Sequence, residues 1–426
     1  MRRFVVYRRT NKLVLNIVLL LSLFVLSCTG STNDRVQKNY TAAEILGNPA
    51  FPAISYGGYR STSRKIQPSL TQIKADVRIL HAMGIRLLRT YNLQFDHSHN
   101  VVKAIHAIQV EDPSFEMYVM LGTWIDCKDA WTDKPDHSQE SLANNSSEIE
   151  KAVDLANQYP EIIKIISVGN EAMVHWAWNY HVAPKVILKW VNHLQQLKAE
   201  RKLPKELWIT SSDNFASWGG GDTSYHNNDL TSLMQAVDYL SVHTYPFHDT
   251  HHNPNFWKKA PENNLKTKEE RIDFTMEQAT NYAKMQYAQV KTHMQSLGID
   301  KPIHIGETGW STSSPDLFGD KGTRAADEYK QALYFTKMRD WAKEKNISCV
   351  YFSAFDEPWK DPNEPKASEN NFGLFTVDGK AKFALWPLVG RGVFDGLSRE
   401  ENGMPVGKTY DGNKSAIWAT ISEINY

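Results

Sequence analysis

The segment IIKIISVGNE at positions 162–171 combines a short apolar run with a polar end. An apolar run of about four to eight residues is typical of a strand that is buried on both faces. Seven similar runs occur along the chain, at 53–59, 85–91, 116–122, 207–211, 239–244, 303–306 and 349–354. We therefore predict eight strands, of which the run at 162–168 is the fourth.

Amphipathic segments lie between these runs. Around 70–80, 186–197 and 332–342, apolar residues recur every three or four positions, which is the period of a helix with one buried face. A strand followed by a helix, repeated eight times, predicts a single-domain α/β fold, the (β/α)8 TIM barrel. An open doubly wound sheet is the alternative, but no G-x-G-x-x-G motif follows the first run.

The N-terminus is typical of a signal peptide. Basic residues precede an apolar run from Leu13 to Leu26, which is shorter than the roughly 20 residues that a membrane-spanning helix needs. The run ends in VLSC at 25–28, which resembles a bacterial lipobox, so we expect cleavage before Cys28 and acylation of that residue. An uncleaved membrane anchor is the alternative. The expected division is 1–27 signal peptide, 28–49 lipidated N-terminus and polar tether, 50–390 barrel and 391–426 a C-terminal segment packed on the barrel.

Charge and cysteine content narrow the classes of partner. The chain has 48 basic and 48 acidic residues and no basic run after the signal peptide, so we predict no nucleic-acid partner. Cys127 and Cys349 lack C-x-x-C pairing, which favours buried free thiols over a disulfide. The histidines within 248–252 lie in a loop rich in Pro and Asn, without neighbouring groups spaced to orient them as metal ligands, so we predict no metal, and we predict no cofactor.

Polar residues close several of the predicted strands. Asn170 and Glu171 close the fourth strand, Glu307 follows the seventh, and Glu357 follows the eighth. Catalytic groups of a (β/α)8 barrel lie at these carboxyl ends, and strands four and seven are expected to face each other across the barrel. Two carboxyl groups that flank one bond are what glycoside hydrolysis needs. A rim salt bridge is the alternative for either glutamate taken alone.

These contexts resemble the clan of retaining barrel glycosidases and, within it, glycoside hydrolase family 17, the β-1,3-glucanases and related glucanosyltransferases. The resemblance extends from about Phe51 to Leu388. The motifs that carry it are ISYG at 54–57, LRTY at 88–91, VGNE at 168–171, ETGW at 307–310, EPWK at 357–360 and FGLF at 372–375. The chain departs from the family at Gly306, where Ser or Thr is common, and at Ser311, where Pro is common.

The resemblance implies that Glu171 is the general acid/base and Glu307 the nucleophile. We expect Arg89 and Tyr245 to hold Glu307 ionised, while the field of that carboxylate favours the protonated form of Glu171. We expect Asn170 to bind the sugar 2-hydroxyl. The predicted substrate-binding residues are Tyr56, Arg89, Tyr91, Asn170, Trp176, Trp178, Tyr245, Trp310, Glu357, Lys360 and Glu369, of which the last two and Glu357 are the family's auxiliary groups.

Tryptophans gather in the strand-end loops, where flat aromatic faces suit sugar rings. We predict that Trp310 and at least one of Trp176 and Trp178 form stacking subsites, because each lies within a few residues of a catalytic glutamate. Core packing is the alternative for any single tryptophan. The other tryptophans with this placement are Trp124, Trp131, Trp218, Trp257 and Trp359.

The sequence therefore predicts a retaining, endo-acting hydrolase of laminarin-type β-1,3-glucan. We expect a monomer, anchored by its N-terminal lipid in the bacterial cell envelope, at the outer membrane and facing either the cell surface or the periplasm. A β-1,3-glucanosyltransferase with the same covalent intermediate is the alternative, because acceptor-side loops decide between water and sugar. A glycan-binding surface lipoprotein without catalysis is the other alternative.

Overall fold

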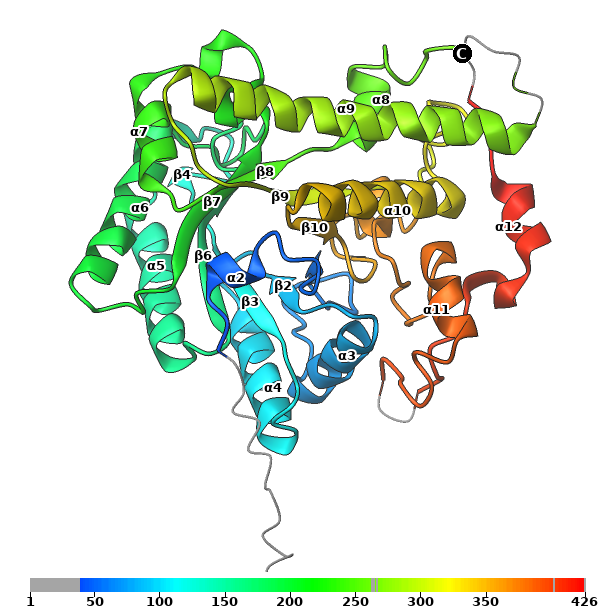
Figure 1. Ribbon diagram of the computed structural model, residues 1–426, viewed down its shortest axis with the longest axis horizontal. Helices are drawn as coiled ribbons and strands as arrows, with labels where there is room; N and C mark the ends of the chain where they lie inside the picture. Colours follow the sequence, from blue (N-terminus) through cyan, green and yellow to red (C-terminus); the bar gives the residue numbers. More distant parts are fainter. Residues whose placement is uncertain (1–38, 262–264, 266, 401–402, 425–426) are drawn as a thin grey trace, which may run out of the picture. The chain divides into compact units, whose positions relative to one another are not determined.

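The computed structural model describes residues 39–261, 265, 267–400 and 403–424. Within this part, eight parallel strands close into a barrel in the order β1-β10-β9-β8-β7-β6-β3-β2 (Figure 1). The barrel strands are β1 Ala53–Ser55, β2 Leu87–Arg89, β3 Tyr118–Thr123, β6 Ile163–Asn170, β7 Trp208–Asn214, β8 Leu240–His243, β9 Ile303–Gly309 and β10 Cys349–Phe352. The predicted TIM barrel and each of its predicted strands are confirmed.

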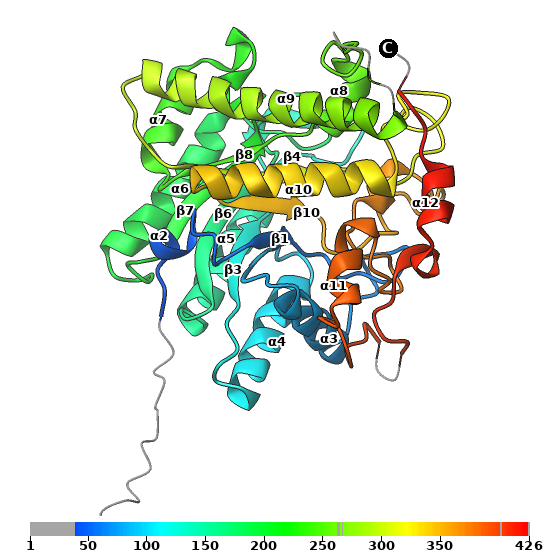
Figure 2. The same cartoon turned by 45° about the vertical axis from the view of Figure 1, so that its right-hand side comes forward.

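Helices alternate with the strands and pack on the outside of the barrel. Figure 2 shows α9 and α10 running side by side, with α10 next to β10. The helices are α2 Ala42–Ile45, α3 Leu70–Ala82, α4 His97–Glu111, α5 Leu142–Gln158, α6 Pro184–Ala199, α7 Asn228–Ala236, α8 Pro246–His252, α9 Lys268–Ser296, α10 Glu328–Lys345, α11 Trp386–Gly390 and α12 Lys414–Thr420. The three segments with the helical period, around 70–80, 186–197 and 332–342, fall within α3, α6 and α10.

The loop between β3 and α5 carries a small antiparallel hairpin of its own. Its strands are β4 (Cys127–Lys128) and β5 (Asp136–Glu140). The hairpin lies next to the loop that follows β6, because Cys127 N–H donates to Tyr180 O at 3.0 Å. These two segments form one wall above the carboxyl ends of the strands.

Helix α2 corrects the predicted extent of the polar tether. Residues 39–49 are ordered against the barrel instead of forming part of a tether, and Ala42 and Ile45 are fully buried. Thr41 caps the helix through a capping box with Glu44. The sequence T-x-x-E followed by apolar residues was the signal for this helix.

The C-terminal segment packs on the main core. Phe394, Val406, Ile417 and Ile421 are buried in the same hydrophobic cluster as the barrel side chains. The Arg399 guanidinium pairs with Asp76 of α3 at 3.2 Å and lies over the Phe355 ring, 3.9 Å from its centroid. The segment is therefore tied to the barrel by both apolar and ionic contacts.

The predicted signal peptide and Cys28 lie outside the described residues. In the part of the chain that the structure describes, no helix is long and apolar enough to cross a membrane. Cys127 and Cys349 are free thiols, as predicted; Cys127 is buried, whereas Cys349 is only partly buried.

Candidate active site

Glu171 and Glu307 converge on one histidine. Nδ1 of His243, the last residue of β8, lies 3.1 Å from Oε1 of Glu171 and 3.4 Å from Oε2 of Glu307. One oxygen of each carboxylate and a nitrogen of this ring lie within 4.8 Å of one another. Retaining glycosidases have carboxyl groups about 5 to 5.5 Å apart, whereas inverting enzymes need about 6.5 to 9.5 Å. The pair has the close spacing that direct attack requires.

We had expected strands four and seven, β6 and β9, to face each other across the barrel, but they do not lie directly opposite each other. In the closed barrel β6 and β9 are separated on one side by β7 and β8. Glu171 directly follows β6, whereas Glu307 lies within β9. The carboxylates meet above β8, which is why a side chain of that strand lies between them.

Glu307 is buried and surrounded by donors. Arg89 Nη1 donates to its Oε1 at 2.9 Å, and the Tyr91 phenol donates to the same oxygen. Burial raises the pKa of Glu307, but the charges of His243 and Arg89 and the hydrogen bond from Tyr91 outweigh burial and hold this pKa below its ordinary value. The carboxylate is thereby kept ionised, as a nucleophile must be.

The phenol that donates to Glu307 is Tyr91, not Tyr245 as we had expected. The Tyr245 ring instead packs against His248, with centroids 5.3 Å apart, and lines the cleft beside the carboxylates. Its pKa is raised well above the ordinary value, first by burial and then by the charge of Glu307. Tyr245 therefore remains neutral and lines the cleft.

A sharp turn carries Glu171. The residue has a φ of 48°, and Gly169 before it has a φ of 82°, both in the left-handed region. The turn is pinned to β7, because Asp213 accepts from the N–H of Met173 at 2.8 Å and from the hydroxyl of Ser217 at 2.6 Å. Burial raises the pKa of Asp213 to about 6, although these hydrogen bonds oppose the shift. A strained turn of this kind persists only when its surroundings hold it in place.

His243 is the functional residue that sequence reasoning missed. It is fully buried, and its Nε2 lies 2.7 Å from Oγ of Ser212, which is 2.8 Å from Oγ of Ser241. These hydroxyls orient the ring so that Nδ1 faces the carboxylates. The signal was present, since His243 lies near the end of the sixth predicted strand, two positions before Tyr245.

The serine pair also explains the unusual Gly306. A Cβ at this position would collide with the hydroxyls of Ser241 and Ser212. The glycine before the nucleophile therefore makes room for the two hydroxyls beneath His243. The departure from the family at Gly306 is thus linked to the buried support of this histidine.

Two cavities meet at the carboxylates and are both lined by Glu171, Glu307, Phe352 and Lys360. The larger half-cleft, of about 680 Å³, is also lined by Trp176, Phe215, Tyr225, Tyr245, His248, Glu369 and Phe372. The smaller half-cleft, of about 460 Å³, is also lined by Tyr59, Tyr91, Trp124, Trp131, Asn170, Tyr180, Glu357 and Trp359. Sugar units can therefore be bound on both sides of a bond placed between the carboxylates.

The three predicted auxiliary groups lie together in this cleft. Lys360 Nζ is 3.5 Å from Glu369 Oε2 and 3.9 Å from Glu357 Oε2, and His248 Nε2 is 3.0 Å from Glu369 Oε1. Burial would raise the pKa of Glu369, but the charge of Lys360 and the bond from His248 lower it to about 2. Burial raises the pKa of Glu357 despite the charge of Lys360. The site thus holds carboxyl groups with opposite pKa shifts on either side of one ammonium.

Trp310 corrects a prediction, because the structure places it in the core. Its side chain is fully buried and its Nε1 donates to Ala325 O at 2.8 Å. The ring packs against Phe247, Trp257 and Tyr334, outside the barrel. Trp310 is therefore no sugar-stacking surface, and Trp218 and Trp257 are likewise buried.

Tyr56 and Arg89 also differ from their predicted substrate contacts. Tyr56 is among the residues that line the smaller half-cleft, but it is fully buried and its hydroxyl donates to Asp76 of α3 at 2.8 Å. Arg89 is 1% exposed and bridges Glu307 and Asn170, donating to Asn170 Oδ1 at 2.6 Å. Arg89 therefore positions the side chains of Glu307 and Asn170.

Trp176 and Trp178 lie on the surface, as a stacking role requires. Trp176 is 63% exposed and lines the larger half-cleft. Trp178 is 58% exposed and is not among the residues that line either half-cleft. The two tryptophans of this loop therefore have different surroundings.

Among the described residues, Glu171, His243 and Glu307 have ligand atoms close enough to share a cation. The neighbouring charges of Arg89 and Lys360 oppose a cation there. A metal would also occupy the two carboxylates that the hydrolysis of a glycosidic bond needs. The predicted loop at 248–252 is helical and belongs to α8, and His248 of this helix is bonded to Glu369.

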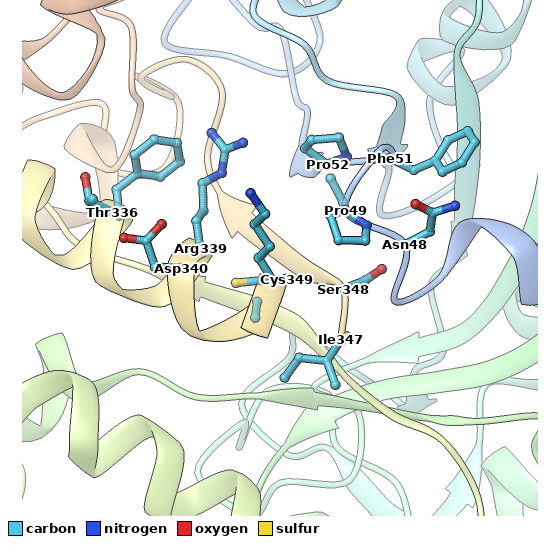
Figure 3. A pocket seen from close by; sticks show the side chains of 14 residues that line it. Asn48, Pro49, Phe51, Pro52, Thr336, Arg339, Asp340, Ile347, Ser348 and Cys349 are labelled. Atoms are coloured by element: carbon cyan, nitrogen blue, oxygen red, sulfur yellow. The ribbon is translucent and has the colours of Figure 1, made fainter. Parts of the chain in front are cut away.

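A separate cavity of about 300 Å³ lies at the amino-terminal end of the barrel, away from the carboxylates. Figure 3 shows Arg339 and Asp340 on one side of it and Asn48 and Phe51 on the other. Its lining includes the first residues of β1 and β10, Ala53 and Cys349. The chemistry of the paired carboxylates is at the other end of the strands.

Comparison with known proteins agrees with this geometry. The family model for the BtgE/BtgC glycoside hydrolase domain matches residues 53–373. An endo-laminarinase from Formosa Hel1_33_131 is 57% identical, with a TM-score of 0.88 over 90% of this chain and 98% of that chain. The predicted resemblance to family 17 β-1,3-glucanases is confirmed at the level of the family.

Other matches are more distant in sequence. The Aspergillus flavus protein named probable glucan endo-1,3-beta-glucosidase btgC is 22% identical over 375 residues, which are 84% of this chain and 47% of that protein. The chain thus spans about half the length of the curated relatives it matches first. A β-1,3-glucanosyltransferase from Rhizomucor miehei, 20% identical with a TM-score of 0.54 over 79% of this chain and 96% of that one, shows the fold alone.

Proposed function

We propose that this chain, which belongs to the family of BtgE/BtgC glycoside hydrolase domains, is a retaining endo-β-1,3-glucanase that acts on laminarin-type glucan. The observation that carries the proposal is the carboxylate pair, with oxygens within 4.8 Å of each other, between two half-clefts. The 57% identity to an endo-laminarinase supports the same substrate class.

In this proposal the reaction has two steps. Glu307 attacks the anomeric carbon while Glu171 gives a proton to the leaving oxygen, so that a glycosyl-enzyme forms and the leaving-group sugar departs. Glu171, now ionised, then takes a proton from a water molecule that attacks the same carbon and releases Glu307. Asn170 accepts from Arg89 through Oδ1, which leaves its amide nitrogen to donate to the 2-hydroxyl.

Each of the two steps inverts the configuration of the anomeric carbon, so the reaction as a whole is expected to retain it. Proton NMR of a fresh laminarin digest should show the β-anomer of the new reducing end first, followed by mutarotation. Product analysis over the same period should show oligosaccharides of mixed length, because both half-clefts bind sugar. An α-anomer as first product would exclude the covalent mechanism.

The same product analysis separates the hydrolase from a glucanosyltransferase. A transferase passes the glycosyl group from Glu307 to an acceptor hydroxyl, so products longer than the starting oligosaccharide would dominate from the beginning. A hydrolase releases reducing ends in step with bond cleavage. Absence of both products would favour a glycan-binding protein.

We further propose that the chain is an acylated, monomeric lipoprotein of the bacterial cell envelope, at the outer membrane. The basic start, the short apolar run and VLSC at 25–28 support the anchor. In the native host, Cys28→Ser should yield protein without lipid by mass spectrometry, and this variant should leave the membrane fraction. Wild-type protein without lipid, or a variant that stays with the membrane, would contradict the anchor.

A further inference from the structure

We propose that Trp178 binds a segment of the glucan outside the cleft, so that the enzyme holds a polysaccharide at a second place on the wall beside Glu171. The inference rests on the proposed function, since it takes its ligand to be the same β-1,3-glucan. The wall consists of residues 127–140, which include the hairpin, and residues 172–182 of the loop after β6.

The first observation is the exposure of a large aromatic side chain on this wall. Trp178 is 58% exposed, although tryptophan is on average a highly buried residue. Its ring meets His137 of β5 edge to face, with centroids 5.0 Å apart at 65°, and more than half of the residue is left to solvent. An exposed indole face is the surface on which the apolar face of a sugar ring stacks.

The second observation is that the wall is held in place. His137 Nδ1 lies 2.9 Å from His181 O, and the rings of these two residues stack with centroids 3.6 Å apart. Val182 N–H donates to Ala172 O at 2.7 Å and so closes the loop at its base. A loop that is fixed before binding loses little conformational entropy when a ligand arrives. The indole is therefore presented on a preorganised surface.

The third observation is continuity with the cleft, which identifies the occupant. Trp131 lines the smaller half-cleft and stacks on Tyr180, with centroids 5.2 Å apart at 19°. Its backbone N–H donates to Asn179 O at 2.8 Å, next to Trp178. Trp131 is itself 58% exposed. Two exposed tryptophans thus lie on segments that are hydrogen-bonded to each other, Trp131 in the cleft and Trp178 outside it. A glucan chain that leaves the cleft beside Trp131 therefore has Trp178 as the next exposed aromatic residue of this wall.

This arrangement predicts a preference for long substrates. A polysaccharide that occupies the cleft can reach Trp178 with another of its segments, and the second contact then forms at high effective concentration. A short oligosaccharide fills the cleft but has no segment left for the wall. Trp178→Ala should therefore lower the ratio of kcat/KM on laminarin to kcat/KM on laminaripentaose by about five-fold, the size of one aromatic contact.

The test compares this ratio for the wild type, Trp178→Ala, Trp178→Tyr and Val110→Ala. Trp178→Tyr keeps an aromatic face and should restore most of the ratio. Val110 is the matched surface control, because it is 70% exposed near the end of α4, the helix that leads away from the cleft towards β3. Equal ratios in all four proteins would overturn the proposal.

A binding measurement separates this inference from the proposed function. Glu307→Gln and the double variant Glu307→Gln, Trp178→Ala are run in native gels that contain laminarin. Weaker retardation of the double variant supports the wall site, and equal retardation refutes it. If the wild type cuts neither laminarin nor laminaripentaose, the proposed hydrolase fails, whereas the gel result still decides whether Trp178 binds glucan.

Discussion

Glu307→Ala is expected to abolish the cleavage of laminarin and of an activated aryl β-glucoside alike. The variant cannot form a glycosyl-enzyme, and a better leaving group does not replace a missing nucleophile. Loss of the nucleophile in another covalent hydrolase lowers kcat on the order of 10⁶-fold, so we expect a loss of at least about 10⁴-fold here. Initial rates of reducing-sugar and aryl-alcohol release measure the effect.

The interpretation requires that the variant fold. Glu307 pairs with Arg89, which is 1% exposed, so its removal leaves a buried guanidinium without its carboxylate. Glu307→Gln keeps an acceptor for Arg89 and should be equally inactive at native stability. Glu150→Ala, at an exposed position of α5, is the matched glutamate control and should retain wild-type rates. Substantial aryl-glucoside turnover by a folded Glu307→Gln enzyme would show that Glu307 is not the nucleophile.

Azide adds a stereochemical check on the same variant. A small anion can occupy the space that the carboxylate leaves and attack the anomeric carbon in its place. A single displacement inverts the centre, so the expected product from an aryl β-glucoside is the α-glucosyl azide. This product identifies the side of the sugar on which Glu307 lies.

The barrel and the catalytic pair were predictable because both depend on local patterns. Buried parallel strands are short apolar runs whatever surrounds them, and the fold itself places their carboxyl ends at one face. Glu171 and Glu307 could therefore be paired without knowing a single distance. Both lie in one site, with His243 between them.

The burial of Trp310 and of the Tyr56 side chain has a shared physical cause. Successive side chains of a strand point to opposite faces, so if Glu307 points into the barrel, Thr308 and Trp310 point outward. Thr308 Oγ1 indeed lies 2.6 Å from the hydroxyl of Tyr334 in α10, and the Trp310 ring packs on the same tyrosine. Tyr56 likewise points outward to α3. The alternation of side chains along a strand could be applied to the sequence, and it predicts the direction of Trp310 correctly. Closeness in sequence to Glu307 was a weaker indication of a role in sugar binding.

His243 and its support could not be predicted in the same way. The hydroxyls of Ser212 and Ser241 come from two different strands, and the space above Gly306 comes from a third. Which polar groups meet inside a barrel depends on the register between neighbouring strands. The prediction that Tyr245 donates to Glu307 failed for the same reason. Only the closed barrel fixes which phenol reaches the carboxylate, and this phenol is that of Tyr91.

Glu171→Ala is expected to separate the two chemical steps. Laminarin has a poor leaving group that needs a proton, so its cleavage should fall by about 10²- to 10⁴-fold, the usual contribution of general acid–base catalysis. An aryl glucoside with a good leaving group departs without that proton, and the glycosyl-enzyme on Glu307 still forms. Deglycosylation then becomes slow, because no carboxylate activates the water.

Stopped-flow measurement of aryl-alcohol release should therefore show a burst of about one equivalent of enzyme, followed by slow turnover. Azide needs no general base, so it should accelerate the slow phase and give the β-glucosyl azide, the opposite anomer from that expected with Glu307→Ala. The Glu150→Ala control should show wild-type kinetics without azide dependence. A burst in Glu307→Ala, together with a Glu171→Ala enzyme that is inactive on both substrates, would mean that the two glutamates have the reverse roles.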